Sequence, residues 1–236
     1  MTDDSGRVAP GYVPALGFAS LTRLYDPVLR ATLREATFKR ALVAQAALVS
    51  GMHVLDLGAG TGTLTLMLQR SAPAAEVVGV DGDAAVLALA RAKATAAGDA
   101  VRFDRAMASA LPYGDAAFDR VVSSLVFHHL SPADKRRTLR EVFRVLTPGG
   151  ELHVADWGRP QNVVMRALFL GVQLLDGFAT TAENVAGMLP ELFREAGFVA
   201  VVETDAFATI FGTLALYRAT RPSTAIPSRI GPPGLR

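Results

Sequence analysis

Short apolar runs alternate with longer amphipathic stretches between residues 53 and 156. A short apolar run is typical of a buried strand, and a longer stretch with apolar residues three or four positions apart is typical of a helix. On this basis strands are predicted near 53–57, 76–80, 100–104, 118–124 and 151–156, with helices near 62–70, 83–97 and 132–145. Because strands and helices alternate, the pattern indicates a doubly wound α/β fold with a parallel sheet and helices on both faces.

The pattern changes after Gly150. A helix is predicted over 182–196, followed by two strand-like runs, 198–203 and 207–218, that are separated only by Thr204-Asp205-Ala206. So short a link cannot hold a crossover connection, so the two runs should pair antiparallel. The prediction is therefore a mostly parallel seven-stranded sheet that ends in a C-terminal antiparallel hairpin.

The two ends of the chain differ from this central region. Residues 1–20 carry glycine and proline without periodicity and are expected to be flexible, whereas 21–49 is predicted to be a helical segment with a kink or second start at Pro27. The tail 219–236 is rich in proline and arginine and is expected to be disordered. A single domain is therefore predicted over 21–218.

The most apolar segment is 163–179. Its longest run without a charged residue, 167–175, lies between Arg166 and Asp176 and is too short to cross a bilayer, so stable membrane insertion is not expected. Apolar residues lie all round this helix, so it should be buried or should cover something apolar. One interpretation is a core helix. The other is a lid, in which 160–182 and 21–49 cap a substrate under Leu168, Phe169, Val172 and Leu175.

Composition narrows the classes of function. The chain has 236 residues, 50% of them hydrophobic, and 24 basic against 22 acidic residues give a formal charge of only +2, so nucleic acid is not an expected partner. The local run Lys135-Arg136-Arg137 is expected to be the solvated face of a helix. The absence of cysteine excludes disulfides and thiolate chemistry, and the first residues do not resemble an export signal, so a cytoplasmic location is expected.

The turn after the first predicted strand carries the clearest chemical signal. Residues 54–62 run from an apolar strand through Asp56 into three alternate glycines, and a helix begins there. Glycines permit positive φ and close approach of a ligand to the backbone, and the helix N-terminus favours an anionic group. A dinucleotide fingerprint would place its last small residue where Thr63 stands. The Asp56 carboxylate instead suits a ligand that carries an ammonium beside its carboxylate, such as S-adenosylmethionine.

These residues resemble the class I S-adenosylmethionine-dependent methyltransferases, and the resemblance continues over roughly residues 20–218. Further motifs follow in the family's order, at 76–81, 110–113 with 117–122, 128–130 and 146–152. The resemblance implies a Rossmann-like fold and a cofactor, S-adenosylmethionine, that leaves as S-adenosylhomocysteine. It also implies that Asp81 accepts both ribose hydroxyls. The expected cofactor-binding residues are Tyr25, Asp56, Gly58, Ala59, Gly60, Gly62, Asp81, Gly82, Met107, Ala108 and Ser123.

Two details refine the resemblance. The run 21–27 is similar to the entry helix of the subgroup that includes ubiquinone and menaquinone C-methyltransferases, in which a tyrosine at the place of Tyr25 folds over the cofactor. A packing role for this aromatic ring is an equal alternative. The adenine loop departs from the family, because Met107 stands where an acidic residue usually accepts the adenine amino group.

Structural alternatives exist for each of these sites. The glycines could form a turn without a ligand, and Asp56 could be satisfied by nearby backbone. Asp81 could cap the helix over 84–97, although Asp83 is the better candidate for that cap.

No catalytic residue is obligatory in such an enzyme, because the sulfonium is already an activated electrophile and the protein mainly aligns the acceptor. Where a general base helps, the candidates are His128, His129 and Asp156, near the carboxyl ends of two predicted strands. Alternatively, the histidines begin the next helix and Asp156 caps or pairs locally. No metal site is expected, because His53 and His153, two of only four histidines, lie inside predicted strands.

The leading hypothesis is transfer of a methyl group to a small, apolar or aromatic acceptor by in-line displacement. A catalytically silent cofactor-binding module and a nicotinamide-dependent oxidoreductase are the alternatives. The sequence leaves open the acceptor, the methylated atom and the oligomeric state.

Overall fold

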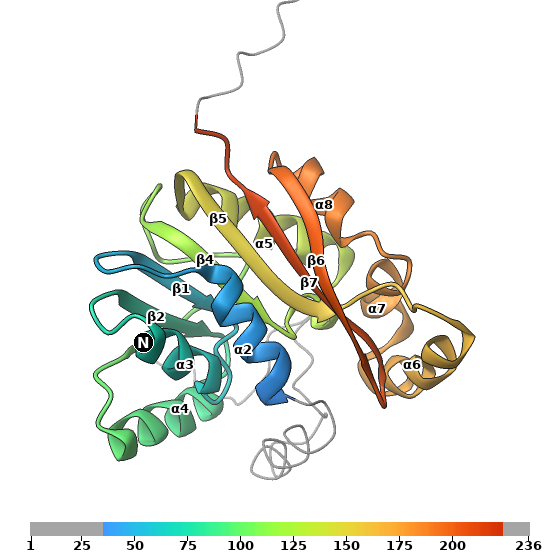
Figure 1. Ribbon diagram of the computed structural model, residues 1–236, viewed down its shortest axis with the longest axis horizontal. Helices are drawn as coiled ribbons and strands as arrows, with labels where there is room; N and C mark the ends of the chain where they lie inside the picture. The colour runs from blue at the N-terminus through green and yellow to red at the C-terminus, as the bar shows by residue number, and fades with distance from the viewer. Residues whose placement is uncertain (1–34, 224–236) are drawn as a thin grey trace, which may run out of the picture.

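The computed structural model describes residues 35–223, apart from the side chains of residues 175 and 176. Its centre is one seven-stranded sheet in the order β3-β2-β1-β4-β5-β7-β6 (Figure 1). The strands are β1 (His53–Leu57), β2 (Glu76–Asp81), β3 (Arg102–Arg105), β4 (Phe118–Ser124), β5 (Leu146–Trp157), β6 (Val199–Thr209) and β7 (Gly212–Thr220). The first five pair in parallel, and β7 pairs antiparallel with both β5 and β6. The predicted fold class is confirmed.

Helices cover both faces of this sheet. They are α2 (Glu35–Ala46), α3 (Thr63–Ser71), α4 (Ala84–Ala97), the short 3-10 helix η2 (Phe127–His129), α5 (Pro132–Val145), α6 (Val163–Asp176), α7 (Phe178–Val185) and α8 (Leu189–Glu195). Residues of α2, α3 and α6 form a core on one face, and residues of α5 and α8 form the core on the other (Figure 1). The carboxyl ends of β1, β4 and β5 therefore meet between two helical layers.

Two predicted element boundaries are wrong. The helix predicted over 182–196 is two helices, α7 and α8, because Gly187 adopts a φ of 72° between them. The hairpin turns at 210–211, not at 204–206, because β6 runs through those three residues with a shift of register between Glu203 and Asp205. An irregular stretch of strand can have the same residue composition as a turn, so the sequence does not distinguish the two. The antiparallel pairing itself is confirmed.

The structure tests only part of the predictions made for the two ends of the chain. Residues 1–34 lie outside the described residues, and with them the predicted flexible start, Pro27 and Tyr25. The helix predicted to reach residue 49 ends at Ala46. At the other end β7 continues to Thr220, two residues past the predicted end of the strand at 218, and residues 224–236 are not described.

The apolar helix α6 is not wholly buried, which contradicts the expectation from its composition. Phe169 and Val172 lie in the core beside Trp157, whereas Leu168 is partly exposed. Across residues 35–223, none of the helices combines the length and the apolar character needed to cross a membrane.

Candidate functional site

The glycine turn links β1 to α3 and uses each of its glycines differently. Gly58, Gly60 and Gly62 have φ values of 75°, 52° and 76°. A Cβ atom on Gly58 would lie 2.2 Å from Val126, and one on Gly62 would lie 2.9 Å from Phe103, whereas one on Gly60 would meet nothing within 4 Å. Two of the glycines thus allow close packing, and Gly60 is the position at which a ligand can approach the backbone.

Asp81 lies at the end of β2 and supports this turn. Its Oδ2 accepts a hydrogen bond from the Gly60 amide at 2.9 Å, and its Oδ1 accepts one from the Asp83 amide at 2.9 Å. Burial raises the pKa of this carboxyl. Asp83, not Asp81, caps α4 by accepting a bond from the Ala85 amide at 2.7 Å. The capping alternative for Asp81 is therefore wrong, and its carboxylate lies beside the open glycine.

Asp56 is almost completely buried in β1, and burial raises the pKa of its carboxyl to about 6, against the opposing effects of Thr65 and Lys39. Its Oδ2 accepts a hydrogen bond from the Thr65 hydroxyl at 2.6 Å. Its Oδ1 has no hydrogen-bond partner within residues 35–223. Nearby groups thus satisfy only one of the two oxygens, and a buried carboxylate oxygen of this kind suits a cationic donor.

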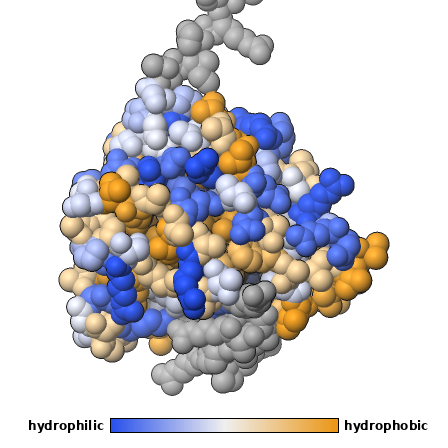
Figure 2. All heavy atoms as spheres, viewed as in Figure 1, coloured by the Kyte–Doolittle hydropathy of each residue, from blue (hydrophilic) through white to orange (hydrophobic). Residues whose placement is uncertain are grey.

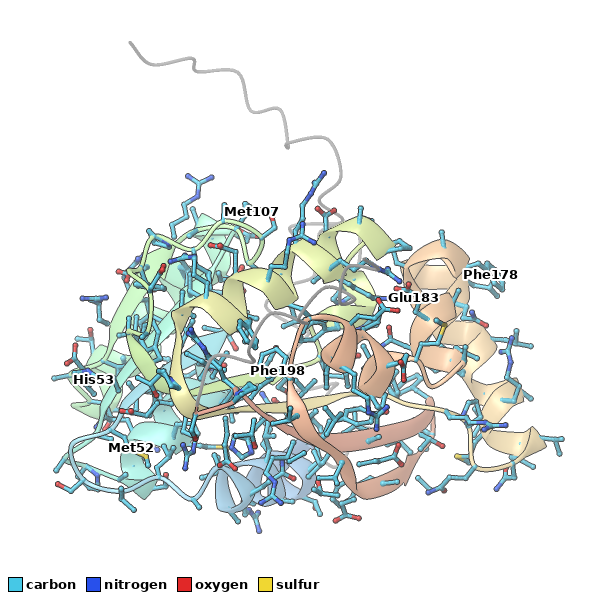
Figure 3. All side chains as sticks on the ribbon, turned by 90° about the horizontal axis from the view of Figure 1, so that it is seen from above. Met52, His53, Met107, Phe178, Glu183 and Phe198 are labelled. Atoms are coloured by element: carbon cyan, nitrogen blue, oxygen red, sulfur yellow. The ribbon has the colours of Figure 1, made fainter. Side chains whose placement is uncertain are left out.

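The predicted adenine side of the site lies next to Asp81. The Ala106 amide donates to the Asp81 carbonyl at 3.1 Å, which attaches the loop to the end of β2. Met107 is 43% exposed, and its sulfur would lie 2.8 Å from a Cβ atom on Gly82 (Figure 3 shows this residue at one edge of the molecule). Ala108 follows, partly buried against the core. These three predicted residues, Gly82, Met107 and Ala108, are therefore brought together.

Ser123 is placed differently. Its side chain is fully buried, and its hydroxyl donates a hydrogen bond of 3.0 Å to the Leu57 carbonyl across the β1–β4 pair. The hydroxyl therefore joins the two strands that carry the turn, and contact with a cofactor by Ser123 stays a prediction.

On the acceptor side, Asp156 at the end of β5 is the most heavily bonded carboxylate of the site. It accepts hydrogen bonds from the amides of Val126, Phe127 and Trp157 at 3.1, 2.7 and 2.8 Å. Its Oδ1 also lies 2.9 Å from Nδ1 of His128. Burial alone would raise the pKa of Asp156, but His128 and the amide donors hold it below its usual value. A carboxylate with this environment is a poor proton acceptor, and it positions the groups that contact it.

The two histidines lie side by side in η2, and their ring centroids are 3.9 Å apart. Since the carboxylate of Asp156 accepts at Nδ1 of His128, we assign the proton to that nitrogen, and Nε2 becomes the ring atom that can accept a proton. Burial, with a smaller effect of His128, lowers the pKa of His129 to about 3, so that ring is neutral near pH 7. Asp156 thus holds Nδ1 of His128, and the neutral His129 ring lies against the His128 ring.

The residue Leu125, just before η2, has a strained backbone conformation. Leu125 has a φ of 59°, a left-handed conformation that a branched side chain rarely adopts, and its amide donates to the Ala155 carbonyl at 2.8 Å. The amide bonds to Asp156 immediately after it keep this conformation in place. Strain of this kind at the end of a strand is typical of functional sites.

The sequence analysis missed two residues that attach α7 to the site. Asn184 donates to Oδ1 of Asp156 and to the Trp157 carbonyl, both at 3.1 Å. Lys135 is not on a solvated face as predicted, because its buried ammonium donates to the Thr180 carbonyl at 2.6 Å and lies 3.3 Å from Glu183 (Figure 3 shows Glu183 between α7 and the neighbouring helix). No local pattern signals either contact.

His53 and His153 lie in β1 and β5 as predicted, and His153 Nδ1 is 3.1 Å from the Gln45 amide nitrogen. Within the described part of the chain, no three histidine or acidic side chains are grouped as a metal site would require.

Comparison with known proteins agrees with this geometry. Residues 54–150 match the methyltransferase domain family. The chain is 38% identical to the demethylmenaquinone methyltransferase of Deinococcus radiodurans over 154 residues, which cover 64% of this chain and 63% of that protein. It is 43% identical to the ubiquinone/menaquinone biosynthesis C-methyltransferase of Hahella chejuensis over 68 residues, which cover 29% and 26%. It thus spans less than two thirds of either relative.

A solved S-adenosylmethionine-dependent methyltransferase from Methanosarcina mazei has the same fold. It superposes with a TM-score of 0.61 at 21% identity, over 76% of this chain and 97% of the other. In its glycine turn, its sheet order and the match over residues 54–150, the chain is similar to the class I S-adenosylmethionine-dependent methyltransferases. Within that class it is similar to the group of ubiquinone and menaquinone methyltransferases.

Proposed function

We propose that this chain binds S-adenosylmethionine at the glycine turn and transfers its methyl group to a small, apolar or aromatic acceptor. The observation that carries the proposal is the buried carboxylate of Asp56, whose Oδ1 has no partner within the described residues, two positions before Gly58. The ammonium of the cofactor's methionine end supplies the cationic donor that this oxygen needs. Gly60 leaves the space beside the backbone open for the same ligand.

The ribose is assigned to Asp81. Each of its oxygens already accepts one backbone amide bond, and an ionised carboxylate has further lone pairs for two hydroxyl donors. The base is assigned to the loop of Met107 and Ala108, which lies beside Asp81. When bound, the cofactor supplies a methyl group on a positively charged sulfur. The other residues of the proposed cofactor site are Tyr25, Gly58, Ala59, Gly62, Gly82 and Ser123.

His128 is proposed as the base that takes the acceptor's proton. When bound, the cofactor would supply its methyl group to the acceptor atom and leave as S-adenosylhomocysteine, and Nε2 of His128 would take the acceptor's hydroxyl proton. Where the acceptor atom is a ring carbon, the hydrogen on that carbon would leave as a proton and the hydroxyl would be restored. Asp156, held by amides of three residues, stabilises the resulting imidazolium through Nδ1–H. Asp156 is thus a positioning residue, and neutral His129 lies against the base.

The acceptor class is inferred from two observations. The relative from Deinococcus radiodurans is named for demethylmenaquinone, a quinone with an aromatic ring and an apolar tail. In this chain two aromatic side chains lie near His128, because the Trp157 ring centroid is 6.2 Å from that of His128 and the buried Phe127 precedes it. No nucleic acid and no metal ion is part of the proposal.

The test is transfer of labelled methyl from S-adenosylmethionine to reduced demethylmenaquinone, followed by extraction into organic solvent. Label in the organic phase is expected, together with a strong loss in His128→Gln and no loss in His53→Gln, which alters an exposed histidine at the far end of β1. Cofactor binding without transfer to this acceptor or to a mixed extract would instead support a catalytically silent module. Preferential binding of NAD would contradict the proposed cofactor.

A further inference from the structure

Helix α6 exposes one apolar face to solvent and buries the polar residue Gln173. Val163, Val164 and Leu174 are 83%, 59% and 75% exposed, and Leu170 is also exposed. Gln173 is buried, and it accepts a hydrogen bond from Arg166 at 2.8 Å. A usual surface helix instead presents polar residues to solvent.

The exposed residues form one continuous face. With 3.6 residues per turn they occupy less than half of the helix circumference, and none of them carries a charged or polar side chain. They are Val163, Val164, Ala167, Leu168, Leu170, Gly171 and Leu174. We refer to these seven residues as the α6 face. Figure 2 shows an orange surface at the lower right, where Figure 1 places α6.

Two neighbours enlarge the α6 face. Phe178, at the start of α7, is 53% exposed and projects from the end of the molecule (Figure 3). Ile210, in the β6–β7 turn, is also exposed, and the next residue but one, Gly212, lies against Phe169 of α6. A contiguous exposed apolar surface of this kind normally marks a contact with a partner or a membrane.

We propose that the α6 face docks on the surface of a lipid bilayer. A 14-residue helix is about 21 Å long and about 10 Å across, so this face offers about 300 Å². A stable protein dimer needs about 800 Å² from each partner, usually with a polar rim, which disfavours a second copy of this chain. A helix that lies in the bilayer interface buries a charge-free apolar face among the acyl chains and keeps its polar residues off that face, as α6 does with Arg166 and Gln173.

The α6 face lies close to the acceptor side of the proposed site. The Phe169 ring of α6 lies 5.4 Å from the Trp157 ring, which in turn lies 6.2 Å from His128. The next helix, α7, bonds to Asp156 through Asn184. A protein docked through the α6 face would therefore hold the acceptor side of its site near the lipid. Docking does not require methyl transfer, so it can be tested independently of the proposed function.

The experiment measures cosedimentation of the full chain with vesicles of phosphatidylcholine and phosphatidylglycerol. The wild-type chain should partition onto vesicles, and the double variant Val163→Gln/Leu174→Gln should partition about tenfold less or weaker still. Val49→Gln is the matched control, because Val49 is an equally apolar, exposed residue outside α6, and its partition should be unchanged. Vesicles should also slow hydrogen exchange in residues 163–178.

Three results would overturn the proposal. Equal partition of the wild-type chain and the double variant would show that the α6 face does not contact lipid. A wild-type dimer in solution that the double variant converts to a monomer, without vesicle binding, would show a protein interface instead. A large fall in the melting temperature of the double variant would show that another segment of the chain covers this face.

Discussion

Replacing Asp56 by Asn should stabilise the ligand-free protein and weaken cofactor binding at the same time. Burial raises the pKa of the Asp56 carboxyl from 3.8 to about 6 in the folded chain. An acid with a higher pKa in the folded state stabilises that state fully below the unfolded value, and this contribution is lost as the pH rises through the folded value. Keeping Asp56 charged at pH 7.5 therefore costs the ligand-free fold free energy.

The size of this cost follows from the two pKa values. Their difference of about two pH units corresponds to about 3 kcal/mol, developed between about pH 4 and pH 6. Asn removes the charge and still offers an oxygen to the Thr65 hydroxyl, but it brings an amide that needs an acceptor. The expected net gain in unfolding free energy at pH 7.5 is therefore about 1–2 kcal/mol.

Cofactor affinity should change in the opposite direction. A charge-assisted hydrogen bond from the cofactor's ammonium contributes about 1.5–3 kcal/mol, so the dissociation constant should rise by roughly one to two orders of magnitude. In the wild-type chain the affinity should also fall as the pH drops below about 6, and in the variant it should not.

Denaturant unfolding without ligand and titration calorimetry with S-adenosylmethionine measure the two effects, each at pH 5 and pH 7.5. Thr65→Val is the matched control, because it removes the bond to the other carboxylate oxygen and leaves the charge. A variant that binds the cofactor as tightly as the wild-type chain would refute the role of Asp56. A variant less stable at pH 7.5 would refute the argument from burial.

Three further predictions concern other positions. Asp81→Ala should weaken cofactor binding by roughly 2–4 kcal/mol in calorimetry, because it removes the ribose acceptor and a bond to the glycine turn; Asp83→Ala, which removes only the helix cap, should leave the affinity nearly unchanged. Met107→Asp should tighten binding by about 1 kcal/mol by giving the adenine amino group an acceptor, and weaker binding by a folded variant would show that packing alone holds the base. Phe169→Ala should lower the unfolding free energy by about 3–5 kcal/mol, because the ring is buried against Trp157. If its main effect is instead on the acceptor's Michaelis constant, the helix is a lid.

The sequence was sufficient for the sheet and the glycine turn, because both depend on local patterns. Strands and helices alternate between residues 53 and 156, and each glycine of the turn occupies the position at which positive φ is needed. The hairpin turn was misplaced, since Thr204 to Ala206 form an irregular stretch of β6 that has the composition of a turn. Local composition does not distinguish the two.

The acceptor side was less accessible to sequence reasoning. His128 and Asp156 could be named from their places after strands, but their roles depend on which donors surround Asp156. One of those donors, Asn184, comes from a helix 28 residues later in the chain. The exposure of α6 was also unpredictable, because an apolar helix is buried only where neighbouring elements are available to cover it, and composition does not report those neighbours.

The hydrogen bonds to Asp156 determine which parts of the site can fold first during synthesis of the chain. The glycine turn and Asp81 depend on residues 54–81 and on Phe103 and Val126, which pack against two of the glycines, and all of these are synthesised before β5. The left-handed Leu125 and the His128 turn need β5, and Asp156 gains its bond from α7 only when residue 184 has been made. We expect the nascent chain to form its cofactor turn well before its acceptor site, so that methyl transfer becomes possible only after most of the chain has been synthesised.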